Sequence, residues 1–343
     1  MLYTRWSRLQ SNLAIILTPL SWLYAFYSWL RNEFYDRGWL TQYRGSPFII
    51  SVGGIEAGGS GKTPVSAYIL QELLAEDKNV GLVSRGYGRK SQGLVIRQKG
   101  QEVIPTQHGD EPTLLLSRYA DVPAAICGKR ALGVEALSQN GVKIIVCDDA
   151  FSHRALHRDL DVVVLRGEAP LADENLLPRG HLRESPQSLQ RADLVWLHHK
   201  SSTHSEQQSD RLAKLLSNKT VVESNSSLSI QTPEGAAIQP QGQEVIALAG
   251  IAHPQSFNDM LVTINLQIVD FISFPDHCAY DSKDLQKIGQ CLEKNPSAKL
   301  LMTAKDYVKL APHWPADRIW IANLELSIVR GEEHLKNALG SAP

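Results

Sequence analysis

The feature that most constrains the fold is a glycine-rich loop at residues 53–64, GGIEAGGSGKTP, between a β-branched run and a helical pattern. Glycines let such a loop turn its N–H groups toward phosphate oxygens, and the N-terminus of the following helix adds a favourable dipole. Lys62 would reach the β- and γ-phosphates, and the Thr63 hydroxyl would bind Mg²⁺. The predicted nucleotide-binding residues are therefore Gly58, Gly59, Ser60, Gly61, Lys62 and Thr63.

The loop departs from the strict pattern at one position. G-x-x-x-x-G-K-[ST] would place glycine at position 56, where this chain has Glu56. A carboxylate there would repel phosphates unless it points away or is paired. The alternative, a flexible Gly/Ser turn with a solvated Lys62, is disfavoured because strand, loop and helix follow in the required order.

From residue 47 onward, short β-branched runs alternate with longer amphipathic stretches, which indicates a P-loop NTPase-like α/β domain with a mostly parallel sheet. The predicted strands are Phe48–Val52, Val80–Val83, Ala124–Cys127, Lys143–Cys147, Asp161–Leu165 and Leu194–Leu197, with helices near Thr63–Ala75, Glu111–Arg118 and Arg130–Ser138. We assign residues 45–205 to this domain.

A second, smaller α/β domain is predicted at residues 244–343, after a linker region at 206–243. Polar Ser-rich residues 201–210 and the Pro- and Gly-containing residues 231–243 favour loops at this junction. The predicted elements are strands Val245–Ala249, Ile268–Phe271, Lys299–Met302 and Ile319–Ile321, and helices near Pro254–Leu261, Ser282–Glu293 and Glu332–Leu339.

The N-terminal residues 1–44 form a separate, aromatic segment. They contain four of the seven tryptophans, and residues 9–30 carry no charge. Aromatic residues spread along 13–30, with basic flanks, favour a helix that lies in a membrane interface. A short membrane-spanning helix and a core helix of the first domain are the alternatives.

Overall charge and cysteine usage exclude several function classes. The 343 residues include 35 basic and 36 acidic side chains, and this balance argues against a nucleic-acid partner bound by bulk electrostatics. The four cysteines, Cys127, Cys147, Cys278 and Cys291, form no CxxC pair. They indicate reduced thiols in an intracellular compartment, without a zinc or disulfide framework.

Two neighbouring acids follow a predicted buried strand. Asp148 and Asp149 come directly after residues 143–147. The carboxyl end of a strand next to the phosphate-binding loop can present an acid to Mg²⁺. The alternative for these two residues is a simple turn.

Further motifs appear in a fixed order: VSRGYGRK at 83–90, HGDEP at 108–112, DDAFSHRALHRDLDVVVL at 148–165, LLPRGHLRES at 176–185, GIAHPQSF at 250–257, FPDH at 274–277 and MTAKDYVK at 302–309. With the aromatic N-terminus and GGSGKTP, they make the chain resemble the tetraacyldisaccharide 4′-kinases of lipid A biosynthesis along its full length. This resemblance implies Mg²⁺- and ATP-dependent phosphorylation of the 4′-hydroxyl of a tetraacylated glucosamine disaccharide 1-phosphate. It also implies a location at the cytoplasmic face of the inner membrane, anchored by the N-terminal helix, with no obligate protein partner.

The resemblance also assigns roles to individual residues. It makes Lys62 and Asp110 catalytic, with Asp110 as the general base and His277 in a supporting role beside it. The residues alone predict only a helix N-cap at Asp110 and a loop at His277. A mixed-charge patch contributes Arg183 and Glu184 as candidate substrate-binding residues.

Several residues near these motifs depart from the family pattern. Besides Glu56 and Gly54, the departures are Ala150, Ser152, Arg166, residues 172–175 and Ala304. They keep a divergent P-loop NTPase and a low-activity lipid- or nucleotide-binding relative open as alternatives. A GTPase is disfavoured because residues 303–306 read TAKD, not [NT]-K-x-D, and metal insertion because a Cys/His cluster is missing from the sequence.

Overall fold

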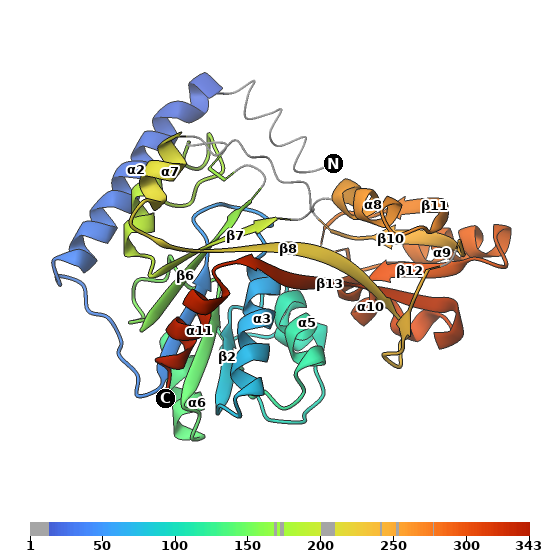
Figure 1. The fold of residues 1–343 in the computed structure, drawn as a ribbon, viewed down its shortest axis with the longest axis horizontal. Coiled ribbons are helices and arrows are strands. Elements are labelled where there is room, and N and C mark those ends of the chain that lie inside the picture. Colours follow the sequence, from blue (N-terminus) through green and yellow to red (C-terminus); the bar gives the residue numbers. More distant parts are fainter. Residues whose placement is uncertain are drawn as a thin grey trace. The chain divides into compact units, whose positions relative to one another are not determined.

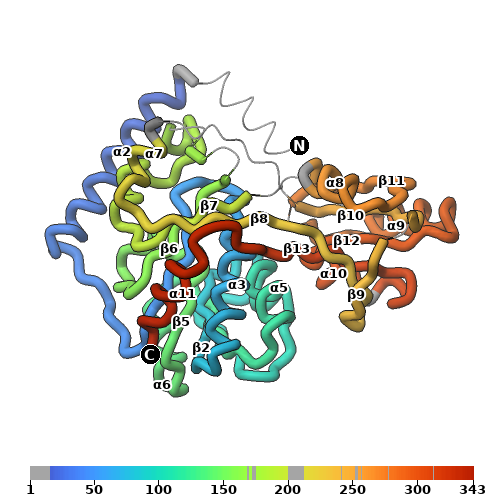
Figure 2. The backbone as a smooth tube through the Cα atoms, in the orientation of Figure 1, coloured from blue at the N-terminus to red at the C-terminus, as the bar shows by residue number. Residues whose placement is uncertain are grey.

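The computed structural model describes residues 14–167, 170–171, 175–199, 210–240, 242–251, 254–276 and 278–343. These residues fold into two compact units. The larger unit contains the chain up to Asn225 together with Leu326–Pro343, and the smaller unit contains Ser226–Glu325. Two long strands, β8 (Thr220–Gln231) and β13 (Ile319–Arg330), carry the chain from one unit to the other, as the tube view shows (Figure 2).

The larger unit is built on a sheet whose strands run in the order β3-β4-β2-β5-β1-β6-β7-β8 (Figure 1). The pairings are parallel except for that of β3 with β4. Besides β8, the strands are β1 (Phe48–Gly53), β2 (Val80–Ser84), β3 (Val95–Arg97), β4 (Ala124–Ile126), β5 (Ile144–Asp148), β6 (Leu160–Arg166) and β7 (Leu194–His199). The predicted mostly parallel α/β sheet is confirmed.

Both faces of this sheet are buried, so its central strands contain apolar residues in succession. Ile144 and Val146 of β5 belong to one core cluster, and Ile145 and Cys147 belong to another. The helices of the larger unit are α2 (Ala14–Asp36), α3 (Lys62–Ala75), α4 (Pro105–His108), α5 (Asp110–Arg118), α6 (Arg130–Gln139), α7 (Asp210–Leu216), the 3₁₀ helix η1 (Pro186–Arg191) and α11 (Glu332–Gly340).

The smaller unit has its own parallel strands, in the order β11-β10-β12-β13. They are β10 (Glu244–Ala249), β11 (Gln267–Ser273), β12 (Lys299–Thr303) and β13, and the short β9 (Ala237–Ile238) pairs with β8. Helices α8 (Pro254–Val262), α9 (Ser282–Lys294) and α10 (Ala304–Leu310) and the 3₁₀ turns η2 (Ala311–His313) and η3 (Ala316–Arg318) complete it.

The compact units differ from the predicted domain boundaries in three ways. The predicted separate segment 1–44 belongs to the larger unit from its first described residue, Ala14, onward. The region 206–243 is more than a linker, because it contains α7 and the twelve-residue strand β8. The smaller unit ends at Glu325 and does not extend to residue 343. The C-terminal helix α11 instead places Leu335 and Leu339 in the main core cluster of the larger unit. The larger unit therefore extends beyond residue 205, and the smaller unit ends before residue 343.

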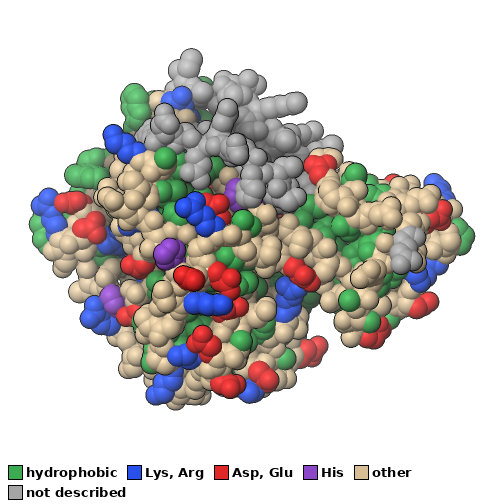
Figure 3. Space-filling view, in the orientation of Figure 1, with side chains coloured by type: hydrophobic (Ala, Val, Ile, Leu, Met, Phe, Trp, Pro, Cys, Tyr) green, Lys and Arg blue, Asp and Glu red, His purple; other side chains and the backbone are tan. Residues whose placement is uncertain are grey.

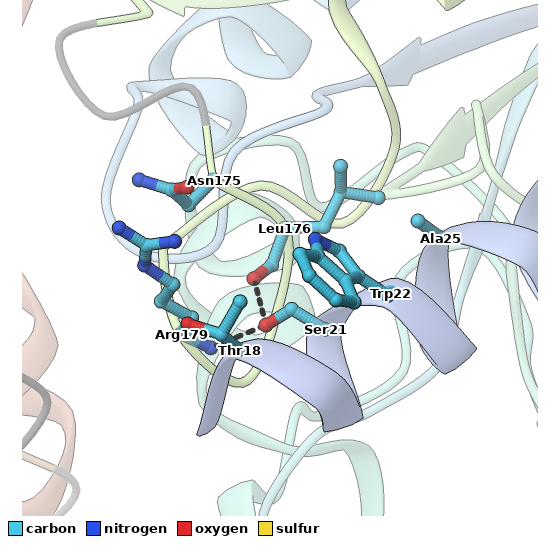
Figure 4. Close-up of a pocket in the computed structure, with 7 residues that line it drawn as sticks. All are labelled: Thr18, Ser21, Trp22, Ala25, Asn175, Leu176 and Arg179. Carbon is cyan, nitrogen blue, oxygen red and sulfur yellow. Dashed lines mark hydrogen bonds between the residues drawn. The ribbon is translucent and has the colours of Figure 1, made fainter. Parts of the chain in front are cut away.

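Helix α2 is fastened to the larger unit mainly through polar groups. Ser21 Oγ donates to the Leu176 carbonyl at 3.0 Å and accepts from the Arg179 N–H at 2.9 Å (Figure 4). A cavity of about 110 Å³ lies beside these contacts and is lined by Thr18, Ser21, Trp22, Ala25, Asn175, Leu176 and Arg179. One polar stripe of α2 therefore packs on the segment that begins at Asn175.

Away from the Ser21 contacts, and along the rim of the cavity, α2 exposes large apolar side chains to solvent (Figure 3). They are Ile16, Leu20, Trp22, Leu23, Phe26, Tyr27 and Trp29, each at least half exposed. The alternative of a core helix is therefore wrong, because a core helix buries such side chains. Among the helices that the structure describes, none is long and apolar enough to cross a bilayer.

Candidate functional site

The glycine-rich loop joins β1 to α3 and needs glycine at two positions. Gly58 adopts a φ of +103° and Gly61 a φ of +90°. A Cβ at Gly61 would lie 2.2 Å from Cδ2 of His198, so a side chain is excluded by contact as well as by φ. Gly61 precedes the first residue of α3. The first N–H groups of a helix have no acceptor within the helix, and no side chain of the described residues caps this end. These N–H groups can therefore bind a phosphate.

The remaining predicted loop residues lie around this helix start. Gly58 and Gly59 are exposed, whereas Ser60 is buried and its Oγ makes no hydrogen bond to the described residues. Lys62 and Thr63 are half-buried in the first turn of α3. A buried hydroxyl without a partner beside exposed glycine N–H groups suits a polyoxygen ligand, because buried polar groups are otherwise hydrogen-bonded.

Glu56 points away from the open part of the loop and is paired. Its side chain is 2% exposed, and Oε1 lies 3.3 Å from Nη2 of Arg166. Its Oε2 accepts a hydrogen bond from the Arg166 backbone N–H at 3.3 Å. Both conditions under which a carboxylate is tolerated here, orientation and pairing, are therefore met.

Asp148 and Asp149 lie beside the loop because of strand register. Val52 of β1 pairs with Asp148 of β5, so the two acids follow the edge at which the loop begins. Ser66 Oγ on α3 donates to Asp148 at 3.1 Å. Lys62 Nζ lies 3.8 Å from Oδ1 of Asp149. The simple-turn alternative does not account for these contacts with the loop and its helix.

The two acids have opposite electrostatic environments. Burial, together with the charge of Asp149, raises the pKa of Asp148 to about 6. Burial would also raise the pKa of Asp149, but the charges of Lys62 and Arg183 outweigh it and hold that pKa below its usual range. Asp149 is therefore ionised at neutral pH, and Asp148, whose pKa lies nearer neutrality, gives up its proton less readily than Asp149.

The oxygen donors at this edge fit Mg²⁺. Proteins usually bind this ion through one or two carboxylates plus substrate phosphates and water. Asp148 and Asp149 provide two carboxylates and Thr63 a hydroxyl. Within the described ranges, no group of three or more His, Cys, Asp or Glu could hold a metal ion. The donors thus suit a cation that also takes oxygen ligands from a nucleotide.

Asp110 begins α5 and is held near this edge by backbone packing. The N-cap of α5 is Gly109, with a φ of +89°, so the N-cap prediction for Asp110 is wrong. A Cβ at Gly109 would lie 2.6 Å from the carbonyl carbon of Gly86, so these two segments require close backbone contact. The adjacent Glu111 contributes to the raised pKa of Asp148. The start of α5 therefore lies within electrostatic reach of the acids.

The structure separates the two predicted substrate-binding residues. Arg183 Nη1 donates to both oxygens of Asp149, at 2.9 and 2.8 Å. Glu184 is 1% exposed, and its Oε2 accepts from Asn32 Nδ2 at 3.1 Å and is paired with Arg191. Arg183 thus contacts the acidic edge, by which we mean Asp148 and Asp149 at the carboxyl end of β5. Glu184 instead holds α2 against the rest of the larger unit. The predicted supporting residue His277 lies outside the described residues.

Sequence reasoning missed three residues at this edge: Ser66, Arg130 and His198. Ser66 follows Thr63 by three positions on α3, a spacing that places both on one helix face and could have indicated it. Arg130 is buried at the start of α6, where Nη1 donates to the Cys127 carbonyl at 3.0 Å. Burial lowers the pKa of Arg130, and the charges of Asp148 and Asp149 oppose that shift. Only the fold brings Arg130 and His198 to this edge.

Comparisons with known proteins give one family over nearly the whole chain. A family model described as tetraacyldisaccharide-1-P 4′-kinase matches residues 13–342. The tetraacyldisaccharide 4′-kinase of Anaeromyxobacter sp. (strain Fw109-5) is 35% identical, with 96% of this chain and 92% of that protein covered. That of Haemophilus influenzae (strain 86-028NP) is 33% identical, with 95% and 92% covered. A crystal structure of LpxK from Aquifex aeolicus in complex with ATP matches with a TM-score of 0.79 at 30% identity, covering 97% of this chain and 98% of that one.

Proposed function

Because the chain belongs to the tetraacyldisaccharide-1-P 4′-kinase family, it is an ATP-dependent kinase of lipid A biosynthesis, and we propose how its residues carry out that reaction. The acceptor is the 4′-hydroxyl of a tetraacylated glucosamine disaccharide 1-phosphate. The observation that carries the proposal is the convergence of Lys62, Arg183 and two carboxylates where the glycine-rich loop meets β5.

Lys62 and the N–H groups at the start of α3 bind the β- and γ-phosphates of ATP. The 4′-oxygen forms a bond to the γ-phosphorus as the bond to the ADP oxygen breaks, and Asp110 accepts the hydroxyl proton. Asp148, Asp149 and Thr63 are the residues that would hold Mg²⁺, which when bound would supply neutralisation of charge on the phosphates.

We infer that Arg183 exchanges its partner Asp149 for a phosphate when the nucleotide binds. Its Nη1 contacts both oxygens of Asp149, and this pair is partly open to solvent, with the two side chains 33% and 37% exposed. A nucleotide phosphate competes for the guanidinium, because arginine binds phosphate as well as carboxylate in a fork-like geometry. Binding of ATP would then free the Asp149 carboxylate, one of the residues that would hold Mg²⁺.

We place this reaction at the inner-membrane surface, with α2 as the docking element. The acceptor carries acyl chains, and α2 exposes a face of Trp, Phe and Leu side chains next to Arg31 and Arg37. Apolar side chains with basic flanks favour insertion into the interface of an anionic bilayer. His277 is retained as a proposed supporting residue beside Asp110, on the resemblance alone.

The reaction is tested with purified full chain, γ-labelled ATP, Mg²⁺ and a detergent-dispersed disaccharide 1-phosphate. Label in the lipid supports the kinase, whereas label released only as phosphate supports an NTPase and no turnover supports a binding relative. Asp110→Asn should lower transfer by roughly 10²–10⁴-fold while ATP binding remains, as expected for loss of a general base. Asp121→Asn, in an exposed pair with Lys99, is the matched control. Wild-type transfer rates in the Asp110 variant would remove it from the mechanism.

Docking is tested by sedimentation with phosphatidylglycerol-containing vesicles. The double variant Trp22→Ser/Phe26→Ser should weaken partitioning by about tenfold or more, because two large apolar side chains no longer enter the lipid. Val262→Ser, which removes an exposed apolar side chain from α8, controls for general surface polarity. Equal partitioning of all three proteins would show that α2 is not the docking surface.

A further inference from the structure

The phosphate-binding loop contains an acid that the reaction does not use. Glu56 is part of the segment 53–61, and its carboxylate is buried at 2% exposure. A negative charge so close to a phosphate site opposes nucleotide binding, and this repulsion is strong where water is excluded. The loop therefore requires a positive side chain that pairs with Glu56 and does not itself bind the nucleotide phosphates.

Arg166 at the end of β6 has the geometry to be that cation. Its Nη2 and its backbone N–H lie 3.3 Å from the two different oxygens of Glu56. The Arg166 side chain is 25% exposed, so the pair is mostly shielded from solvent. Because one residue engages both carboxylate oxygens, the orientation of Glu56 and its charge are fixed together.

The same stretch of loop is also tied by its backbone. Glu56 forms an isolated antiparallel bridge with Leu182. The Ala57 N–H donates to the His181 carbonyl and the Arg183 N–H donates to the Ile55 carbonyl, both at 2.6 Å. These bonds hold residues 55–57 against residues 181–183, while the Glu56 side chain contacts Arg166. The entry to the loop is thus fastened on both sides.

We propose that Arg166 is a positioning residue for nucleotide binding, which neutralises Glu56 and holds the loop entry so that ATP meets no net negative charge there. It acts through Glu56 and not by touching ATP. This inference rests on ATP binding by the loop, which the family membership supports independently of the pair. The two positions are 110 residues apart, so only the folded chain brings them together.

The test compares Arg166→Gln, Glu56→Gln and the double variant in the lipid phosphorylation assay, with direct binding of a non-hydrolysable ATP analogue. Arg166→Gln leaves an uncompensated carboxylate and should raise the KM for ATP and the analogue Kd by about tenfold, with a smaller change in kcat. The double variant, which removes both charges, should return both constants to within about twofold of the wild-type values. Glu56→Gln alone should leave them unchanged or lower.

Each contrary outcome overturns the inference while leaving the kinase assignment intact, because the wild-type protein is assayed in parallel. A double variant as weak as Arg166→Gln would mean that Arg166 binds ATP itself or only supports the fold. Unchanged binding in Arg166→Gln would remove the pair from nucleotide binding. If Arg166→Gln does not fold, Arg166→Lys is used. It keeps the positive charge but loses the Nη2 contact with Glu56, so about a threefold loss is expected, again removed by Glu56→Gln. A loss in Arg166→Lys that Glu56→Gln does not remove would contradict the inference.

Discussion

Arg183 and Glu184 are neighbours in the chain, but their side chains enter regions that use charge differently. Arg183 faces the acidic edge, where its partner Asp149 is 37% exposed. Glu184 lies where α2 packs on the larger unit, and it is 1% exposed and surrounded by Arg191, Asn32 and Arg31. We call this group of contacts the fastening of α2. The first pair can exchange partners with a ligand, whereas the second is enclosed by protein.

The difference shows that exposure, more than charge type, separates a binding group from a fastening group. A partly exposed ion pair contributes little to stability and can open at little cost. A buried carboxylate left without its cation carries a large desolvation penalty. Variants at the acidic edge should therefore lower activity, and variants at the fastening should lower stability.

Among the variants that test this comparison, Lys62→Met at the acidic edge should have the largest effect. This change removes the ammonium that contacts Asp149 and would bind the phosphates, and we expect a loss in kcat of roughly 10²–10³-fold. The folded structure should persist, because the Asp149 carboxylate that Lys62 contacts is 37% exposed and keeps its contact with Arg183. Lys99→Met, in an exposed pair with Asp121, should retain wild-type turnover. Normal turnover in Lys62→Met would show that the acidic edge is not the phosphate site, and its difference from the Glu184 contacts would then have no functional meaning.

The next largest effect belongs to the fastening. Glu184→Gln leaves Arg191 and Arg31 without their anion, and we expect the free energy of unfolding in urea to fall by about 3 kcal/mol. Glu33→Gln removes the exposed pair with Arg37 on the same helix and should cost less than about 0.5 kcal/mol. Equal stability of the two variants would contradict the structural role of Glu184.

Arg183→Gln tests the neighbour of Glu184 for the opposite behaviour. Loss of a bidentate, charge-assisted contact should reduce kcat/KM for ATP by about tenfold. The free energy of unfolding should change by less than about 1 kcal/mol, because the pair with Asp149 is partly solvated. If Arg183→Gln unfolds as readily as Glu184→Gln and has a normal kcat/KM for ATP, both residues stabilise the fold and Arg183 does not bind the nucleotide.

The sequence predicted the parts of the site whose residues lie together in the chain. The strand, loop and start of α3 are contiguous, and Asp148 and Asp149 directly follow a buried strand. The partner of Glu56 could not be predicted in the same way, since the Glu56–Arg166 pair requires β1 and β6 to be neighbours. The different environments of Arg183 and Glu184 likewise depend on contacts with distant Asp149 and Asn32.

Strand β8 was missed for a different physical reason. Its buried positions alternate as in a strand, but they include Ser224 and Ser226 where apolar residues are expected. Ser224 Oγ is satisfied by Trp196 Nε1 at 2.7 Å and contacts His198 Nδ1 at 2.9 Å. A polar inner face removes the period-two hydrophobic signal, so a Ser-rich strand resembles a loop. The C-terminal helix α11 was predicted, but its packing on the larger unit depends on tertiary contacts alone.

A pH-dependent effect is expected at His153, whose pKa depends on arginines from both regions, Arg31 of α2 and Arg130 at the acidic edge. Burial and the charges of Arg130 and Arg158 lower its pKa to about 4, with Arg31 and Arg85 adding to the shift. Below its usual pKa of 6.5, the unfolded chain binds a proton that the folded chain does not bind.

The free energy of unfolding should therefore decrease as the pH falls from about 6.5 to about 4, and the contribution of His153 should level off below that. His153→Gln should reduce this slope, measured by urea unfolding of the variant and the wild-type protein at several pH values. An unchanged slope in His153→Gln would show that His153 is protonated in the folded protein. In that case the arginines from α2 and the acidic edge do not form one positive environment around it.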